Sequence, residues 1–198
     1  MNKISITAAS SVTAADLAGV PPGQRFGQRF GRLDLQSQLS LLAVESLNLD
    51  FNGMARERTG ICLATSAGSL STDVNFWQGR DGTGGRSPTL FAYTLPSAAA
   101  GEIAIHFKVT GPNLCFVGDG QTVLPEAFDL IRRGEADGCV CVFSEVVSAE
   151  LAKIISAPPR AGAWALCLKR GDGVRELREF DRDMKALCAL ISHTKSAV

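Results

Sequence analysis

Residues 95–145 read LPSAAAGEIAIHFKVTGPNLCFVGDGQTVLPEAFDLIRRGEADGCVCVFSE, and this stretch decides the fold. A helix over 97–107 leads through a Gly-Pro-Asn turn into an apolar strand over 114–117. A glycine-rich turn, a helix capped by Thr122 and a second apolar strand over 138–143 follow. Strands and helices that alternate in this way predict an α/β fold with a mainly parallel sheet.

The turn after the first of these strands reads Gly118-Asp119-Gly120 and contains no nucleophilic side chain. Many α/β enzymes hold a catalytic serine or cysteine at such a strand–turn–helix junction. One interpretation makes Asp119 an acid or base with Glu145 or Asp137 nearby, although a lone carboxylate in a glycine turn is more often a turn former. Another interpretation is an anion site, in which Gly118, Gly120 and the next helix hold the phosphate of a pantetheine or nucleotide.

The remaining sequence extends this pattern to five strands. Short apolar runs predict strands over 4–8, 60–66 and 163–168, and Asp34 or Ser37 can cap a helix that ends near residue 49. We expect a single domain over residues 1–198, with the order β-α-β-α-β-α-β-β-α and helices on both faces. Its last element is an amphipathic helix over 174–192, indicated by Val174, Leu177, Phe180, Met184, Leu187 and Ile191.

The composition excludes several classes of function. The chain has 20 basic and 20 acidic residues, which gives no electrostatic argument for binding nucleic acid or an anionic membrane. No apolar run reaches the roughly 18 residues that a membrane span needs. The first residues do not resemble a secretory signal, so we expect a cytoplasmic protein without a membrane span.

The six cysteines lie in apolar runs and are expected to be buried free thiols, as in a reducing compartment. Cys139 and Cys141 form a C-x-C pattern in a strand, where alternate side chains share one face and serve as small core residues. No second pair with ligand spacing exists, so we expect no metal and no cofactor. His106 and His193 are expected to be structural or solvated.

Several short motifs, in order along the chain, resemble the N-terminal half of a β-ketoacyl synthase, a condensing enzyme of the thiolase fold. The resemblance begins at Gln38, Ala43, Glu45 and Leu47, which match the family's first long helix. It continues through Ser87-Pro88, Leu95-Pro96-Ser97, Ala100-Gly101 and Gly111-Pro112-Asn113. It ends with Glu126-Ala127-Phe128, Ile131-Arg132-Arg133-Gly134, Glu135-Ala136-Asp137 and Glu145.

The chain departs from this family where the chemistry takes place. The family carries a nucleophilic cysteine in an A-C-[AS]-[TS]-G turn, and the matching position here is Gly118-Asp119-Gly120. Cys115 lies earlier, inside the strand, so it is at most a displaced nucleophile. The two catalytic histidines of the family lie in a C-terminal half, on motifs that this sequence does not contain. Condensation by this chain alone is therefore not expected.

The resemblance implies a non-catalytic subunit similar to a chain length factor. Such a subunit pairs with and stabilises a full-length β-ketoacyl synthase that elongates a chain bound to acyl carrier protein, in fatty-acid or polyketide synthesis, including that of aryl polyenes. In family dimers the nucleophile strand pairs with its copy in the partner, which predicts an interface at Asn113, Leu114, Cys115, Phe116 and Val117. Partner residues also line the acyl tunnel, and Phe91, Tyr93 and Leu95 match that region; the alternative is that these three only pack in the core or its loops.

Two alternatives stay open at this point. One is a stand-alone homodimer of ketosynthase ancestry that binds an anion or a pantetheine, because a fold does not fix a function. The other is an acyltransferase that uses non-standard residues. A half of the fold also leaves an apolar face bare, and the helix over 174–192 is expected to cover it.

Overall fold

The computed structural model describes residues 3–19, 26–27, 29–51, 54–79, 87–178 and 181–195. Its elements in chain order are β1 (Ile4–Thr13), α1 (Ala14–Ala18), η1 (Phe30–Arg32), α2 (Leu35–Glu45), η2 (Arg56–Arg58), β2 (Thr59–Thr65), α3 (Leu70–Gln78), α4 (Pro88–Phe91), α5 (Ala98–Phe107), β3 (Asn113–Val117), α6 (Val123–Arg132), β4 (Gly138–Val147), α7 (Ala149–Ile155), β5 (Arg160–Arg170), β6 (Arg175–Glu176) and α8 (Met184–Lys195).

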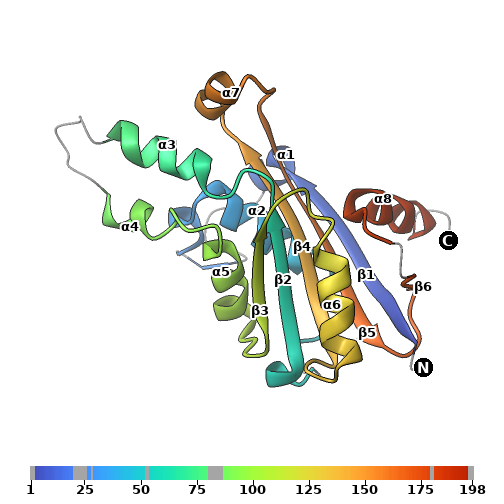
Figure 1. Ribbon diagram of the computed structural model, residues 1–198. Helices are drawn as coiled ribbons and strands as arrows, with labels where there is room; N and C mark the ends of the chain where they lie inside the picture. Colours follow the sequence, from blue (N-terminus) through green and yellow to red (C-terminus); the bar gives the residue numbers. More distant parts are fainter. Residues whose placement is uncertain are drawn as a thin grey trace.

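Within the described residues the strands form one open sheet with the order β3-β2-β4-β5-β1-β6. Figure 1 shows this sheet as the centre of the molecule, with β3 at one edge and β6 at the other. The strands β2, β3 and β4 run parallel, whereas β5 is antiparallel to β4 and to β1, and β6 is antiparallel to β1. The α/β class is therefore confirmed.

Two details of the predicted sheet are wrong. The sheet has six strands in the described chain rather than five, and its antiparallel pairs make it mixed rather than mainly parallel. The connection from β4 to β5 explains the difference. A parallel return needs a helix that crosses the face of the sheet, but α7 packs beside α3 beyond the end of the sheet. The chain consequently turns back, and β5 lies antiparallel along β4.

Helices cover both faces of the sheet, as the sequence predicts. On one face α2 and α5 form a core with the strands, through side chains such as Leu39, Val44 and Ile103. On the other face α6 and α8 form a second core, through side chains such as Leu124, Ile131 and Leu187. Figure 1 shows α6 against β2 and β4 and α8 beside β1, while α3 and α4 extend away from the sheet.

The predicted helix over 174–192 is wrong in its first part. Backbone N–H groups of Val174 and Leu177 donate to Ile6 and Ile4 of β1, at 2.8 and 3.0 Å, so this segment forms β6. The helix starts after Asp183, whose carboxylate accepts a hydrogen bond from the Ala186 N–H at 3.0 Å and so favours a helix start there. The predicted core position at residue 180 lies outside the described residues.

The prediction that the last helix covers the open face of the sheet is confirmed. Met184, Leu187, Cys188 and Ile191 are each at most 5% exposed and pack against β1 and β5. Five of the six cysteines are buried free thiols, and Cys115 is half-buried. Cys139 and Cys141 share the second core, as their spacing predicts.

Candidate functional site

The Gly118-Asp119-Gly120 turn follows β3 and lies at the end of the sheet where the parallel strands finish. The Gly118 N–H donates to the Thr65 carbonyl oxygen at 2.9 Å, which fixes the turn to β2. Asp119 is a turn former, because its carboxylate accepts the Gln121 N–H at 3.1 Å. Gly120 has φ +85°, and a Cβ atom there would lie 2.7 Å from the Phe143 ring. Only glycine fits this position without displacing its neighbour.

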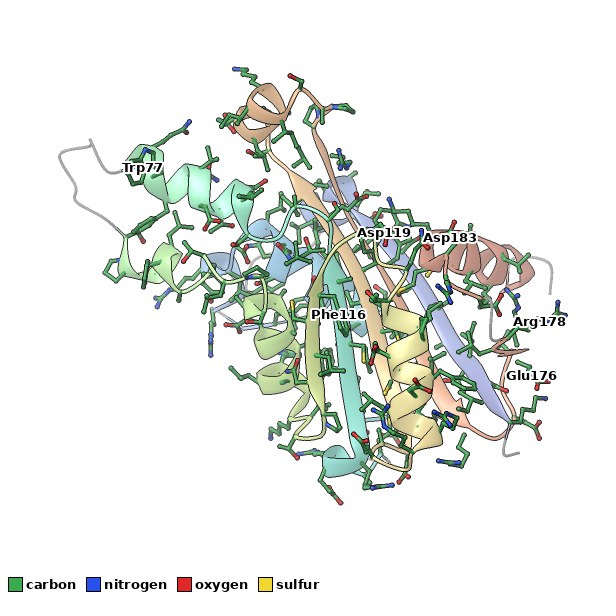
Figure 2. All side chains as sticks on the ribbon, in the orientation of Figure 1. Trp77, Phe116, Asp119, Glu176, Arg178 and Asp183 are labelled. Atoms are coloured by element: carbon green, nitrogen blue, oxygen red, sulfur yellow. The ribbon has the colours of Figure 1, made fainter. Side chains whose placement is uncertain are left out.

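A hollow of about 620 Å³ opens between this turn and the start of α8. Its lining includes Ser66 after β2, Asp119 and Gly120 of the turn, Glu145 of β4 and Lys185 of α8. Figure 2 shows Asp119 and Asp183 at the same end of the sheet, one on the turn and the other at the start of α8. The first residues of α8 therefore form one wall of the candidate site.

Glu145 is the most strongly bound side chain of this hollow. Its carboxylate accepts hydrogen bonds from Ser66 Oγ at 2.9 Å, Arg160 Nε at 3.2 Å and Lys185 Nζ at 2.5 Å. We call these four residues the Glu145 cluster. Burial raises the pKa of the Glu145 carboxyl, but the hydrogen bonds from Lys185 and Ser66 and the charges of Lys185 and Arg160 outweigh it and hold this pKa below its usual value.

Lys185 also contacts two aromatic rings. Its Nζ lies 4.4 Å from the centre of the Trp164 ring and 5.1 Å from that of Phe143, a cation–π arrangement. The rings themselves stack at 5.9 Å. Lys185 thus joins α8 to β4 and β5 beside the turn, and its ammonium is engaged in binding Glu145.

The structure separates the carboxylates of the acid–base interpretation. Asp137 precedes β4 and pairs with Arg58 at 2.8 Å, whereas Glu145 lies eight residues further along the same strand. At about 3.3 Å per residue this places them roughly 26 Å apart. Asp119 and Glu145 line the same hollow, but a carboxylate that already accepts three hydrogen bonds is a poor base.

Cys115 lies on the opposite side of β3 from the hollow. Its side chain packs against the α2 and α5 core, whereas Leu114 and Phe116 pack against the α6 and α8 core. Burial raises the pKa of the Cys115 thiol, which keeps it protonated near neutral pH. This environment is that of a packing residue and not that of an activated nucleophile.

The interface strand β3 is the edge strand on its side of the sheet, with no further strand beside it among the described residues. Hydrogen bonds from Ile61 N to Pro112 O at 2.8 Å and from Gly118 N to Thr65 O at 2.9 Å mark the two ends of its ladder with β2. Because alternate residues of a strand bond to the same side, the backbone groups of Asn113, Cys115 and Val117 point outward.

The predicted tunnel residues have different environments. Phe91 is 61% exposed and Leu95 63% exposed, whereas Tyr93 is 6% exposed. The Tyr93 hydroxyl donates to Glu102 at 3.1 Å, and Arg29 pairs with the same carboxylate at 2.7 Å. Phe91 and Leu95 are therefore free to contact another molecule, while Tyr93 anchors their segment to α5.

The exposed segment adjoins the end of β3. A Cβ atom on Gly68 would lie 3.5 Å from Pro96 and 3.8 Å from Val117, so these two residues are close neighbours around Gly68. Val117 is itself 64% exposed. The predicted interface strand and the predicted tunnel segment thus meet at one surface.

Sequence reasoning missed most of the Glu145 cluster. The sequence indicates Glu145 as a family match and as a possible acid–base neighbour of Asp119, but it does not single out Ser66, Arg160 or Lys185. Ser66 is the last residue of the strand predicted over 60–66, and its position at the strand end is a weak signal of a site. Lys185 is 40 residues from Glu145 and carried none. Across the described ranges, no three His, Cys, Asp or Glu side chains gather in a way that suits a metal ion, and no helix is both long and apolar enough for a bilayer span.

Comparison with known proteins matches residues 23–154 to the family described as "Beta-ketoacyl synthase, N-terminal domain". A curated relative, 3-oxoacyl-[acyl-carrier-protein] synthase 2 of Staphylococcus aureus (strain N315), is 28% identical over 118 residues, which are 55% of this chain and 28% of that protein. The chain therefore spans a little over a quarter of the length of the curated relatives it matches.

Two solved structures share the fold. The ishigamide ketosynthase/chain length factor superposes with a TM-score of 0.72 at 21% identity, over 87% of this chain and 64% of the other. A ketosynthase in complex with its chain length factor from Xenorhabdus doucetiae superposes with a TM-score of 0.62 at 22% identity, over 87% of this chain and 81% of the other. At these identities the likeness shows a common fold.

Proposed function

The chain belongs to the β-ketoacyl synthase N-terminal domain family, and on that premise we propose that it is a non-catalytic subunit that pairs with a full-length β-ketoacyl synthase. Its role would be that of a chain length factor: it stabilises the active subunit and helps to shape the acyl tunnel. The active subunit would elongate chains carried by acyl carrier protein, in type II fatty-acid or polyketide synthesis, a class that includes aryl polyene synthesis.

The edge of β3 is the observation that carries this proposal. Asn113, Cys115 and Val117 direct backbone donors and acceptors outward along an uncharged strand. An edge of this kind is a template for pairing with another chain and an aggregation hazard if it stays bare. An antiparallel strand from a related sheet supplies the complementary groups, and a ketosynthase has such a sheet.

Two further observations support the division of labour. The turn after β3 has no thiol or hydroxyl, and Cys115 points away from the hollow with a raised pKa. Solved neighbours of the same fold are complexes of a ketosynthase with a chain length factor. Both observations favour a subunit that contributes a binding surface, while its partner carries the catalytic residues.

Co-expression with a ketosynthase from the same genome tests the proposal. We expect a stable complex by size-exclusion chromatography with light scattering, and condensing activity that needs both chains. Intact-mass measurement after incubation with acyl-carrier-protein thioesters should show the acyl group on the partner alone. A ketosynthase that is fully active by itself and elutes separately contradicts the proposal, and a dimer of this chain that ignores the ketosynthase supports the homodimer alternative.

The tunnel part of the proposal has its own test. Leu95→Trp adds bulk at an exposed position beside β3 and should shorten the products of the complex. Ile154→Trp on α7, at a side chain 67% exposed and remote from β3, is the matched control. If the Leu95→Trp complex and the unaltered complex make products of equal length, Leu95 does not line the tunnel.

A further inference from the structure

The connection between α4 and α5 presents Leu95, which is 63% exposed, from a backbone that is held on both sides. On one side Ser69 Oγ donates a hydrogen bond to the Thr94 carbonyl oxygen at 2.8 Å. On the other side the Ala98 N–H donates to the Leu95 carbonyl oxygen at 3.0 Å. Figure 1 shows this connection on the β3 side of the sheet. The backbone of Leu95 is thus fixed, although its side chain buries little area.

Two residues earlier, Tyr93 ties the same connection to α5 through a buried carboxylate. Tyr93 and Glu102 are 6% and 8% exposed. Glu102 Oε1 accepts hydrogen bonds from the Tyr93 hydroxyl at 3.1 Å and from Arg29 at 2.7 Å, so the charge of this carboxylate is paired. Burial raises the pKa of the Tyr93 hydroxyl and the Glu102 charge adds to this effect, so the hydroxyl remains a donor. We call these three residues the Tyr93 network.

The Tyr93 network supports an apolar side chain that its own packing does not hold. Hydrophobic stabilisation scales with the area removed from water, so the exposed Leu95 side chain gains little from burial. Its position therefore depends on the hydrogen bonds of its neighbours. Pro96 and Val117 both adjoin Gly68, at 3.5 and 3.8 Å from a Cβ atom placed there, so the supported segment lies beside the end of β3. Support from behind is what a functional side chain needs to keep a precise position.

From this arrangement we infer that Glu102 is a positioning residue for product length: through Tyr93 it holds Leu95 where the growing acyl chain ends. The inference rests on the proposed function, because it concerns the acyl tunnel that this chain would help to shape. Successive products differ by one two-carbon unit, and a single methylene in an apolar pocket changes binding by a factor of roughly 10–200. A Leu95 that is held in place excludes the next unit by a clash, whereas a Leu95 that yields admits it.

Hydrogen exchange of the isolated full chain tests the positioning step. Tyr93→Phe keeps the ring and removes the hydroxyl that binds Glu102. The N–H groups of Tyr93, Thr94 and Ala98 all donate within the segment that is supported. We expect these three amides to exchange roughly fivefold faster in Tyr93→Phe, because one net hydrogen bond no longer opposes local opening.

Ser10→Ala is the matched control for this variant. Ser10 is 7% exposed on β1, and its hydroxyl donates to the Ala43 carbonyl oxygen at 2.6 Å. The substitution removes one buried hydrogen bond, as Tyr93→Phe does, but at a place that does not touch the α4–α5 connection. It should leave the exchange of the three amides unchanged.

The length of the products made together with a ketosynthase tests the functional step. Tyr93→Phe and Glu102→Leu should each raise the share of products longer than the main one roughly fivefold, opposite to the shortening expected from Leu95→Trp. Glu102→Gln keeps an oxygen that accepts the Tyr93 hydroxyl, so it should restore the original distribution. Ser10→Ala should not alter it. The readout is a ratio of products, so it does not depend on how much of each variant is folded.

Three results would overturn the inference and leave the proposed function standing. The first is unchanged exchange of the three amides in Tyr93→Phe. The second is faster exchange with an unchanged product distribution, which would make the Tyr93 network a structural contact only. The third is an equal rise of long products in Tyr93→Phe and Ser10→Ala, which would indicate general destabilisation. An unaltered chain that forms no complex with a ketosynthase contradicts the proposed function itself, and the inference fails with it.

Discussion

The two edges of the sheet are built in opposite ways. On one side β6 has only two residues, Arg175 and Glu176, both charged, and α8 packs close to it on the adjoining strands. On the other side β3 has five residues, none of them charged, with Leu114, Cys115 and Phe116 half-buried. Short charged edge strands are a common protection against unwanted pairing.

This contrast shows where the molecule is closed and where it is open. The β6 edge carries ion pairs from Arg175 to Asp181 at 2.9 Å and from Lys3 to Asp172 at 3.2 Å, so it is suited to water. The β3 edge continues into exposed Val117, Leu95 and Phe91. An apolar patch that includes unpaired strand backbone marks an interaction site, and the following predictions test that assignment.

The largest expected effect comes from proline at the open edge. Val117→Pro removes an outward N–H from β3 but none from its ladder with β2. The complex would lose the hydrogen bond that the Val117 N–H donates to the partner strand, and the proline ring would clash with that strand. Together these should cost about 3 kcal/mol of binding free energy, or roughly a hundredfold in the Kd of the complex with a ketosynthase. Surface plasmon resonance with the two purified subunits measures this Kd.

The matching change at the other edge is Glu176→Pro in β6, and it should leave this Kd unaltered. Both variants need to melt within a few degrees of the original chain for the comparison to hold. Equal loss of binding from the two edges would show that β3 is not the docking strand.

The closed side depends on α8, and its attachment is the next test. Leu187 is 5% exposed in the second core, and Leu187→Ala should lower the free energy of unfolding by about 2–3 kcal/mol. Leu190 lies on the same helix at 53% exposure, and Leu190→Ala should cost under about 0.5 kcal/mol. Urea unfolding measures both changes, and similar losses would mean that α8 does not stay packed on the sheet in solution.

Local sequence signals predicted the parts of this fold that depend on neighbouring residues. Apolar runs located β2, β3 and β4 to within a few residues, and Asp34 caps α2 by accepting the Ser37 N–H at 3.0 Å, as predicted. The glycines predicted the Gly118–Gly120 turn correctly. Gly120 has φ +85° and lies close to the Phe143 ring, and both features require a glycine.

Local sequence signals did not predict the contacts between segments that are distant in the sequence. The antiparallel pairing of β1 with β5 joins residues about 150 to 165 positions apart, such as Thr13 with Gly162 and Ile4 with Arg170. The strand that replaces the start of the predicted last helix depends on the β1 backbone. At the candidate site, nothing near Glu145 indicates that Lys185 will reach it. The sequence therefore predicted the elements and the empty turn, but not the cluster that closes the hollow beside it.

The turn at the end of the open edge gives a smaller effect. Gly120→Ala places a methyl group 2.7 Å from the Phe143 ring at a positive φ, and should lower the free energy of unfolding by about 1–2 kcal/mol. Gly118→Ala meets no described atom within 4 Å and should cost less than about 0.5 kcal/mol. Thermal melting distinguishes the two. If both substitutions are tolerated equally, the turn is not the rigid end of β3 that a defined interface needs.

The smallest effect concerns the ion pair that holds α8 beside the turn. A carboxyl whose pKa is lowered on folding adds stability above its unfolded pKa, about 4.3, and that contribution disappears as the pH falls through the lower folded value. Lys185→Met removes the shortest hydrogen bond to Glu145. Because Lys185 is 44% exposed, the loss at pH 7 should be at most about 1 kcal/mol.

That loss should shrink as the pH falls below the ordinary glutamate pKa of about 4.3 and through the lowered folded pKa of Glu145. Lys153→Met on the exposed side of α7 is the control and should change stability little at any pH. Unfolding curves at a series of pH values from 7 down to the acid limit of folding test the sign. A destabilisation by Lys185→Met that stays constant over the whole series would mean that Lys185 acts through its contacts with Trp164 and Phe143. The start of α8 would then be held beside the turn by its contacts with these rings and not by the Glu145 ion pair, in sharper contrast to an open edge that offers hydrogen bonds.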